Sequence, residues 1–241
     1  MKEFWQGAVK ITRALWYEEV QGCVLCGRVG ALVCPTCTSG YFHPELERCR
    51  GCGKLILKEK TSCLDCEAGK GPKHLDQITA WGHYSGDLRE FIKNIKFQAH
   101  PRSLMEIARP FANWAIRQLP AVDGVVAVPM HVSRLAERGF NQAEVLASAL
   151  HWELGLPIIE AVERVKPTPT QVFLSRHDRL HNLKDAFAVR EPGSITGRSV
   201  WLVDDVTTTG ATLEAVAEVL RVSGVQAIYG LCLAAGLEKN L

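Results

Sequence analysis

Four C-x-x-C pairs dominate the amino-terminal part of the chain and constrain what it can fold into. Eight of the nine cysteines belong to these pairs, and all eight come before residue 67. The first twenty residues contain Glu3, Glu18 and Glu19 and no apolar signal-peptide core, so we expect the chain to stay in the cytoplasm, where thiols remain reduced. Metal binding is then favoured over a disulfide framework. The paired cysteines are Cys23, Cys26, Cys34, Cys37, Cys49, Cys52, Cys63 and Cys66.

Thiolate pairs at this spacing are typical of structural zinc sites. Each C-x-x-C turn directs two sulfurs at one ion, and zinc takes four such ligands, so the eight thiolates suit two structural Zn²⁺ ions. Gly27 and Gly53 follow the first and third pairs, where a positive φ lets N–H groups of the turn face sulfur. Pairing in chain order would place two neighbouring pairs on each ion, but a cross-braced arrangement stays open. Cys232 lies in an apolar run typical of a buried strand.

The overall composition is that of an ordinary globular protein with one full domain and a small module. The 241 residues include 28 Lys+Arg and 26 Asp+Glu, which gives a formal net charge of +2. This balance argues against a basic coat for duplex DNA, and no apolar run reaches the roughly 18 residues that span a bilayer. Gly69, Gly71 and Pro72 mark a linker. We therefore predict an amphipathic helix at 1–20, a zinc-binding ribbon module at 21–70 and a larger domain at 71–241.

Beyond the linker, apolar β-rich runs alternate with amphipathic helical segments. This alternation predicts an α/β fold with a parallel sheet covered on both faces. Asn141 with Glu144, and Ser103 with Glu106, have the spacing of helix capping boxes. The polar stretch from 162 to 197 shows no strong strand, which is typical of a functional or mobile loop. The predicted strands are 78–84, 124–129, 157–162, 200–205 and 225–235, and the predicted helices include 88–95, 103–119, 141–154 and 211–223.

The sharpest motif is a buried strand that ends in two acids and continues through a threonine-rich loop into a helix. It reads V-W-L-V-D-D-V-T-T-T-G-A-T, residues 200–212. A helix N-terminus exposes unpaired N–H groups and the positive end of the helix dipole, which favours a phosphate. Threonine hydroxyls add donors, and Gly210 lets the backbone approach an anion closely. Asp204 and Asp205 can accept hydrogen bonds from ribose hydroxyls or hold a hydrated Mg²⁺.

Residues 200–212 resemble the phosphoribosyl-diphosphate (PRPP) binding loop of type I phosphoribosyltransferases. The wider pattern is similar to the ComF family of competence-associated proteins, and the likeness runs from about residue 20 to the end. It implies a parallel-sheet, type I phosphoribosyltransferase-like domain, with hood elements at 75–120 and a core at 121–241, preceded by a small double-zinc-ribbon module. Besides the loop, it rests on V-P-M-H at 128–131, Arg134, R-G-F-N-Q at 138–142, Arg164, Gln171, Arg179, Asn182 and Phe187.

Carried over residue by residue, the resemblance implies a complete PRPP site. The two acids would hold the ribose hydroxyls, the loop the 5′-phosphate, and the turn after residues 124–129 the pyrophosphate, beside two arginines whose guanidinium groups suit phosphoryl oxygens. Polar groups of the hood and the long loop would close over the leaving group. In this order the residues are Asp204 and Asp205; Thr207, Thr208, Thr209, Gly210, Ala211 and Thr212; Pro129, Met130, His131, Arg134 and Arg138; and Lys93, Lys96, Arg164, Lys166, Gln171 and Arg179.

Two functions from different classes follow. The first is Mg²⁺-dependent binding or transfer of a 5-phosphoribosyl group, which the family resemblance associates with natural competence and DNA uptake. The alternative is a non-catalytic accessory that handles single-stranded DNA with its zinc module, where lysines contact the backbone and Trp81 or Tyr84 stacks on bases. The expected partners are PRPP or a related compound, single-stranded DNA and DNA-uptake proteins. The lysines concerned are Lys54, Lys58, Lys60, Lys70 and Lys73.

Overall fold

The computed structural model describes residues 22–23, 25–31, 33–42, 47–56, 60–98, 104–105, 107–166, 183 and 185–237. The predicted helix at 1–20 and the capping pair Ser103 and Glu106 lie outside these ranges. No helix of the described part is long and apolar enough to cross a membrane. The described elements are α2 (Pro35–Tyr41), α3 (Leu64–Glu67), β1 (Gln77–His83), α4 (Gly86–Gln98), α6 (Ala108–Gln118), β2 (Gly124–Ala127), α7 (Val132–Arg138), α8 (Gln142–Leu154), β3 (Val162–Arg164), β4 (Phe187–Val189), a 3-10 turn (Pro192–Ser194), β5 (Ser199–Thr207), α10 (Ala211–Val222) and β6 (Ala227–Ala235).

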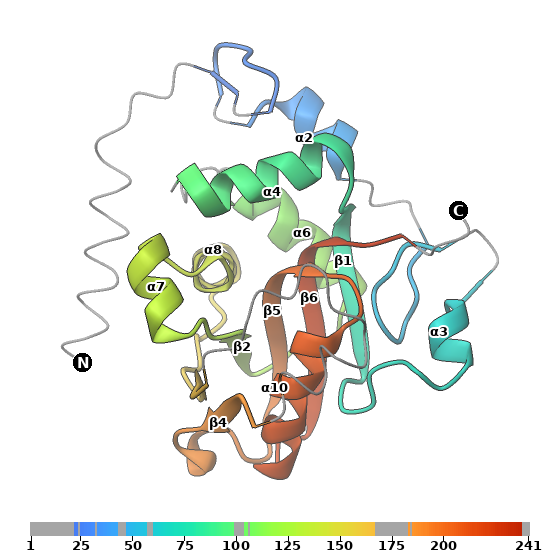
Figure 1. Cartoon of the computed structure of the whole chain (residues 1–241), viewed down its shortest axis with the longest axis vertical. Helices are drawn as coiled ribbons and strands as arrows, with labels where there is room; N and C mark the ends of the chain where they lie inside the picture. Colours follow the sequence, from blue (N-terminus) through green and yellow to red (C-terminus); the bar gives the residue numbers. More distant parts are fainter. Residues whose placement is uncertain are drawn as a thin grey trace.

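A parallel sheet in the order β1-β6-β5-β2 forms the centre of the molecule (Figure 1). The register of β5 with β6 runs from Ser199 opposite Ala227 to Thr207 opposite Ala235. Because the strands are parallel, their carboxyl ends meet at one edge, where ligand sites form in α/β sheets. The predicted α/β class with a parallel sheet is confirmed.

Alternating side chains of the strands build one core on each face of the sheet. Trp201 and Val203 pack in a cluster with residues of α4, α6 and α8. Val200 and Leu202 face the other way and pack with residues of α10. Cys232 is completely buried in this second core, as its apolar surroundings predict.

Two predictions about the chain after α8 are wrong. Residues 157–162 do not form a strand of the sheet, because Ile158 makes only an isolated parallel bridge to Val125. The stretch from 162 to 197 contains two strands, since β3 and β4 pair antiparallel. Each of these strands has three residues, which is too short for an alternating pattern to reveal.

The start of α8 follows its predicted capping pattern. Asn141 Oδ1 accepts a hydrogen bond from the Ala143 N–H at 3.1 Å, and Asn141 Nδ2 donates to the Val128 carbonyl at 3.0 Å and to Glu144 Oε1 at 3.1 Å. These contacts join the helix to the end of β2. Asn141 therefore has a structural role.

Phe42, which follows α2, ties the first cysteine segment to the domain. Its ring stacks on Trp81 of β1 with 4.0 Å between centroids, and Phe111 and Trp114 of α6 continue the aromatic cluster. Trp81 is only 4% exposed. The prediction that Trp81 could stack on a nucleic-acid base is wrong, because its ring is buried and already packs against aromatic side chains of the core.

Arg48, just before the third C-x-x-C turn, binds the edge strand β1. Its Nη2 donates to the Trp81 carbonyl at 2.9 Å, its Nε donates to the Ala80 carbonyl, and its guanidinium carbon lies 5.1 Å from the centroid of the Trp114 ring. Burial lowers the pKa of Arg48 to about 10, so the side chain remains charged at neutral pH. The second cysteine segment thus covers an edge that would otherwise be open to pairing with another chain.

The predicted hood, residues 75–120, contains β1, α4 and α6. β1 is an edge strand of the central sheet, parallel to β6, and α6 packs against both α8 and β1. This segment therefore shares its sheet and its core with residues 121–241. The boundaries between the three parts of the chain stay predictions.

Replacing Arg48 with alanine should lower the free energy of unfolding by about 2 to 3 kcal/mol, because two backbone carbonyls and an aromatic face lose a charged partner. Chemical denaturation of the full chain measures the change. Arg50→Ala is the matched control, since that side chain is exposed, and should stay within about 0.5 kcal/mol of the parent. Equal stability of the two variants would contradict the role of Arg48.

Candidate functional site

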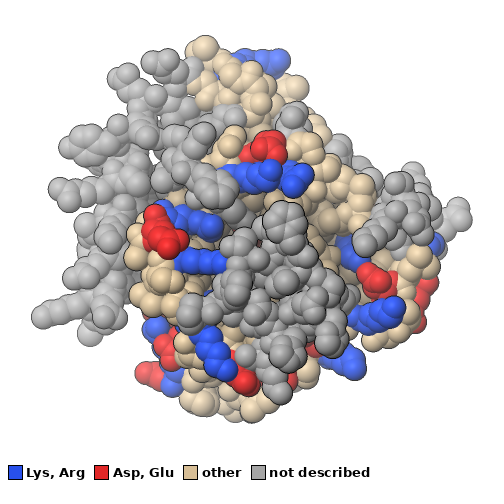
Figure 2. Space-filling view, in the orientation of Figure 1, with Lys and Arg blue, Asp and Glu red and all other residues tan. Residues whose placement is uncertain are grey.

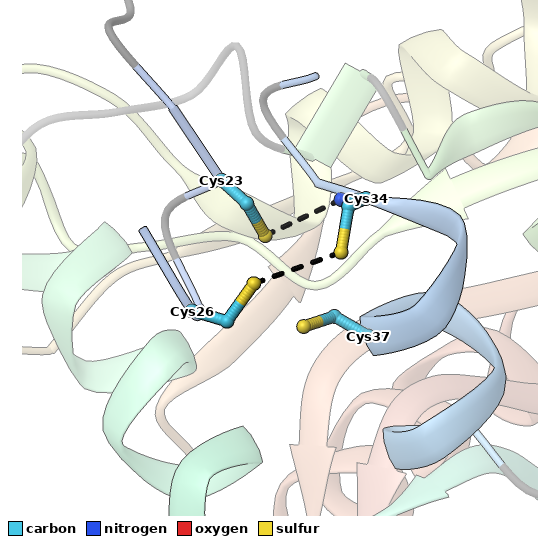
Figure 3. A group of neighbouring side chains, drawn as sticks. All are labelled: Cys23, Cys26, Cys34 and Cys37. Atoms are coloured by element: carbon cyan, nitrogen blue, oxygen red, sulfur yellow. Dashed lines mark hydrogen bonds between the residues drawn. The ribbon is translucent and has the colours of Figure 1, made fainter. Parts of the chain in front are cut away.

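Two cysteine tetrads share one local design. In each, the first C-x-x-C turn is followed by a glycine, Gly27 or Gly53, with the predicted positive φ of 73°, whose N–H donates to the carbonyl of the turn's first cysteine. A short helix, α2 or α3, provides the other two cysteines, one at its N-cap and one at its third residue. Figure 3 shows the sulfurs of the first tetrad pointing at a common centre. The tetrads are Cys23, Cys26, Cys34 and Cys37, and Cys49, Cys52, Cys63 and Cys66.

The sulfur positions fit a tetrahedral metal site. Within each tetrad all four sulfurs lie within 4.8 Å of one another, and the Sγ–Sγ distance is 3.7 Å between Cys26 and Cys34 and 3.5 Å between Cys52 and Cys63. A zinc tetrahedron with bonds of about 2.3 Å has edges of about 3.8 Å. The pairing follows chain order, so the cross-braced alternative is excluded. Each tetrad could hold one ion with sulfur at every position, the arrangement of a structural site.

The second tetrad favours at least one thiolate. A hydrogen bond from the Cys52 side chain, supported by the backbone N–H of Cys63, outweighs burial and lowers the pKa of Cys49 to about 4. The thiolate is the form that binds a metal. Beside this tetrad, Lys54 Nζ lies 2.5 Å from Asp65 Oδ2 and its side chain is 12% exposed. The prediction that Lys54 contacts a nucleic-acid backbone is wrong, because its side chain is largely buried and forms an ion pair with Asp65. Lys58 lies outside the described residues.

The carboxyl end of β5 presents the two acids and the threonine-rich loop. Asp204 and Asp205 are the sixth and seventh residues of β5, and the Asp205 N–H donates to Asp204 Oδ1 at 2.8 Å. Gly210, with φ +76°, is the N-cap of α10, and Thr209 Oγ1 accepts a bond of 3.4 Å from the Ala211 N–H. The twelve-residue helix α10 thus begins directly under the loop, with its first N–H groups at the site.

A pocket lies over this loop. Its empty volume, including the open mouth, is about 240 Å³. Thr207 lines it and is 3% exposed, and within the described residues its Oγ1 has no hydrogen-bond partner. An unsatisfied buried hydroxyl in a pocket wall is a group that a polar ligand or a water can satisfy. The lining residues are Asp204, Val206, Thr207, Thr208, Thr209, Gly210, Ala211, Thr212 and Leu213.

Two arginines, Arg138 and Arg164, lie within electrostatic reach of the two acids, and Arg134 lies within electrostatic reach of both arginines. Burial lowers the pKa of Arg138, at the end of α7, while Asp205 opposes this effect and Arg134 adds to it. Burial likewise lowers the pKa of Arg164, with Arg134 adding to the effect and Asp204 opposing it. Figure 2 shows basic side chains on the face that carries α7. The structure therefore brings together arginines and acids that lie far apart in the sequence.

Gln142 is a residue of this site that the predicted set omits. It is 3% exposed, and its Oε1 accepts a bond of 3.0 Å from Arg138 Nη1. Its Nε2 is buried and has no hydrogen-bond partner among the described residues. Arg138 ends α7 and Gln142 begins α8, so their contact depends on the turn at 139–141 and no helical spacing in the sequence indicates it.

The predicted pyrophosphate turn follows β2, beside β5 at the carboxyl edge of the sheet. Pro129 and Met130 are half-buried there. His131 is the N-cap of α7, and its Nδ1 accepts from the Ser133 N–H at 3.3 Å and lies 2.8 Å from Ser133 Oγ. The local contacts of His131 are those of a helix cap.

The remaining predicted cations have local partners or lie outside the described residues. Lys93 pairs with Glu90 of its own helix at 2.8 Å, and Lys166 lies 3.5 Å from Asp185. No contact in the described part of the chain joins either lysine to the acids of β5. The side chain of Lys96, and Gln171 and Arg179, lie outside the described residues.

Comparisons with known proteins agree with this arrangement. The phosphoribosyl transferase domain family matches residues 96–241. Competence protein F of Haemophilus influenzae is 35% identical over 195 residues, which cover 77% of this chain and 84% of that protein. DNA utilization protein YhgH of Escherichia coli K12 is 31% identical over 205 residues (77% and 88%), and competence protein ComFC of Streptococcus pneumoniae is 28% identical over 198 residues (80% and 83%).

Both comparisons point to the same group. The family match covers the sheet from β2 onward with the loop and the arginines, and the relatives extend the likeness over most of the chain. The chain belongs to the phosphoribosyltransferase domain family and, within it, to the ComF group of competence and DNA utilization proteins.

Proposed function

We propose that this protein binds PRPP at the carboxyl end of β5, in a Mg²⁺-dependent manner, and holds or transfers its 5-phosphoribosyl group. One observation carries the proposal: two carboxylates lie beside a threonine loop at a helix N-terminus, and two arginines, Arg138 and Arg164, lie within electrostatic reach of these carboxylates. These groups are complementary to a sugar that has a phosphate at one end and a diphosphate at the other.

Each part of the site has a chemical task in this proposal. The N–H groups of Thr208 to Thr212 bind the 5′-phosphate, and the buried Thr207 hydroxyl offers a further donor. Asp204 and Asp205 accept hydrogen bonds from the ribose hydroxyls. The turn at 129–131 and the nearby arginines receive the diphosphate. Bound Mg²⁺ supplies further neutralisation of the diphosphate charge.

For transfer, the chain contributes positioning and charge complementarity. Breaking the bond between the anomeric carbon and the diphosphate moves negative charge onto the leaving group. In this proposal Arg134, Arg138 and Arg164 stabilise that charge, and Gln142, whose Oε1 accepts from Arg138 Nη1, orients the Arg138 guanidinium. Held substrates lose less entropy in reaching the reactive geometry.

We further propose that each cysteine tetrad binds one structural Zn²⁺ ion. Four cysteine sulfurs at tetrahedral spacing support this assignment, and the second tetrad has only a small cluster of buried residues around it.

Elemental analysis of the purified full chain should find two zinc ions per chain, because each tetrad offers four sulfurs at matching distances. Cys49→Ser should retain one ion. Cys232→Ala is the matched control and should retain both, since Cys232 lies in the core of the sheet. An unchanged zinc content in Cys49→Ser would contradict the assignment.

Calorimetric titration of the parent chain with PRPP in Mg²⁺ buffer should show saturable binding. The double variant Asp204→Asn/Asp205→Asn should bind PRPP about tenfold or more weakly, because charge-assisted hydrogen bonds to the ribose are lost. Glu218→Gln is the matched control, an exposed acid on α10. Absence of binding by the parent chain would overturn the proposal. Pyrophosphate release with purine or pyrimidine acceptors, lost in the double variant, separates transfer from binding alone.

Single-stranded DNA is a second candidate ligand, favoured by the names of the relatives, which refer to competence and DNA utilization. Among the predicted contacts, Lys70 and Lys73 are exposed beside the second tetrad. In this candidate function their side chains contact the phosphates of a single-stranded backbone.

Fluorescence anisotropy with a labelled single-stranded oligonucleotide should show binding that weakens with salt. Lys70→Ala and Lys73→Ala should each reduce the slope of log affinity against log salt by about 0.7, because each removes one phosphate contact. Arg198→Ala, an exposed cation just before β5, is the control. Binding that is absent at low salt, or equal slopes in all variants, would contradict this candidate.

A further inference from the structure

The second cysteine tetrad and the phosphate loop are connected by two consecutive residues of the linker. Gly71 lies against Cys66, where a Cβ on the glycine would come within 2.7 Å of the Cys66 Sγ. Pro72 lies against Gly210, where a Cβ would come within 2.7 Å of the Pro72 Cγ. The dipeptide Gly71-Pro72 therefore lies between Cys66 and Gly210, the N-cap of α10. A side chain larger than hydrogen at Gly71 or Gly210 would clash with its neighbour.

The linker is then fastened along α10 itself. The backbone N–H groups of Lys73 and His74 donate to Glu214 Oε1 and Oε2 at 2.9 and 3.1 Å. His74 Nδ1 lies 2.8 Å from Glu214 Oε1, and Arg221 Nε donates to the His74 carbonyl at 3.0 Å. Glu214 is in the first turn of the helix that begins at the loop, so a displacement of the linker acts directly on that turn.

A second connection reaches the loop from the other side. The Leu55 N–H, three residues after Cys52, donates to the Gly236 carbonyl at 3.2 Å. The Gly236 N–H in turn donates to the Thr207 carbonyl at 3.0 Å, where the loop begins. The second tetrad is thus joined to the loop at both its start and its end.

The first tetrad has different surroundings. Cys23, Cys34 and Cys37 belong to the core on the α4 and α6 face of the sheet. The first residues of α10, including Ala211 and Leu213, belong to the core on the opposite face. The two tetrads, equal in sulfur geometry, therefore differ in their connection to the loop.

We propose that metal binding at the second tetrad and phosphate binding at the loop are energetically coupled. A filled tetrad holds Cys66 and hence Gly71 and Pro72 in place, and Pro72 supports Gly210 in the conformation that directs the N–H groups of the loop at an anion. Loss of this metal releases the linker and weakens phosphate binding. By thermodynamic linkage, a bound phosphate ligand strengthens binding of this metal by the same coupling free energy. The inference rests on the proposed ligand of the loop.

Two variants separate the tetrads. Cys66→Ser and Cys37→Ser each remove the cysteine at the third residue of its short helix. In the full chain, Cys66→Ser should speed hydrogen exchange of the amides at 206–213 by about tenfold. It should also weaken the affinity for ribose 5-phosphate, measured by calorimetry, by about tenfold, which is a typical size for coupling between sites. Cys37→Ser should leave both within about twofold of the parent. Equal effects of the two variants, or none from Cys66→Ser, overturn the coupling.

A third variant tests the contact with both metals retained, and decides the question if Cys66→Ser does not fold. Pro72→Ala should keep two zinc ions and speed exchange at 206–213. It should also abolish the effect of ribose 5-phosphate on the equilibrium distribution of zinc between the protein and a chromogenic chelator. Pro35→Ala, beside Cys34 at the start of α2, is the matched control and should match the parent. The proposal is overturned if Pro72→Ala leaves both the exchange rate and the effect of ribose 5-phosphate on the zinc distribution unchanged.

The same measurements separate this inference from the proposed function. If the parent chain binds no ribose 5-phosphate and no PRPP while Cys66→Ser and Pro72→Ala still speed loop exchange, the ligand assignment fails and the mechanical connection stands. If the parent binds and the variants bind equally well, the connection fails and the ligand assignment stands.

Discussion

The hydrogen-bonded pairing of β5 with a parallel strand on each side determines where the candidate site lies. β6 pairs along β5 as far as Thr207, and β2 pairs with its first half, so β5 has no free edge over its apolar residues. The apolar part must lie in the interior, and the polar residues that follow it must emerge at the carboxyl edge. Because β2 ends at the same edge, the turn at 129–131 and the arginines of α7 come beside the acids of β5.

The cysteine segments depend on that sheet for part of their packing. The second tetrad has only a small cluster of buried residues, its own cysteines and Ile56. It gains further contacts by covering β1, through the carbonyls that Arg48 binds and through the Arg50 carbonyl, which accepts from the Ile78 N–H at 3.1 Å. A segment of this size cannot bury enough apolar surface alone, so sulfur ligation and docking on a larger core together replace a core of its own.

The sequence predicts well those features that repeat over many residues or that lie within one short segment. Strand and helix periodicity predicts β1, β5, β6, α8 and α10 closely, and the capping of α8 follows from residues three apart in the chain. The eight cysteines of the tetrads follow from their spacing in the sequence, but the choice of chain order over a cross-braced arrangement required the structure.

Features that depend on a distant partner could not be predicted in this way. Nothing near Trp81 in the sequence shows that Phe42 will cover it, and the pairing of Lys54 with Asp65 depends on how the turn at 49–54 meets α3. The bridge at Ile158 and the three-residue strands β3 and β4 are set by neighbouring strands, since their own patterns are too short. The role of Gln142 appears only when Arg138 is known to face Asp205.

The repeated design of the tetrads has a consequence for how such segments arise. All the groups that shape one sulfur site lie within 15 to 18 residues of chain, from Cys23 to Cys37 and from Cys49 to Cys66. The outer surface of each unit takes no part in that geometry. A copied unit can therefore keep its metal chemistry while its exterior changes to suit a new neighbour. Here one unit faces an aromatic cluster and the other covers an edge strand, so the same sulfur geometry is combined with two different exteriors.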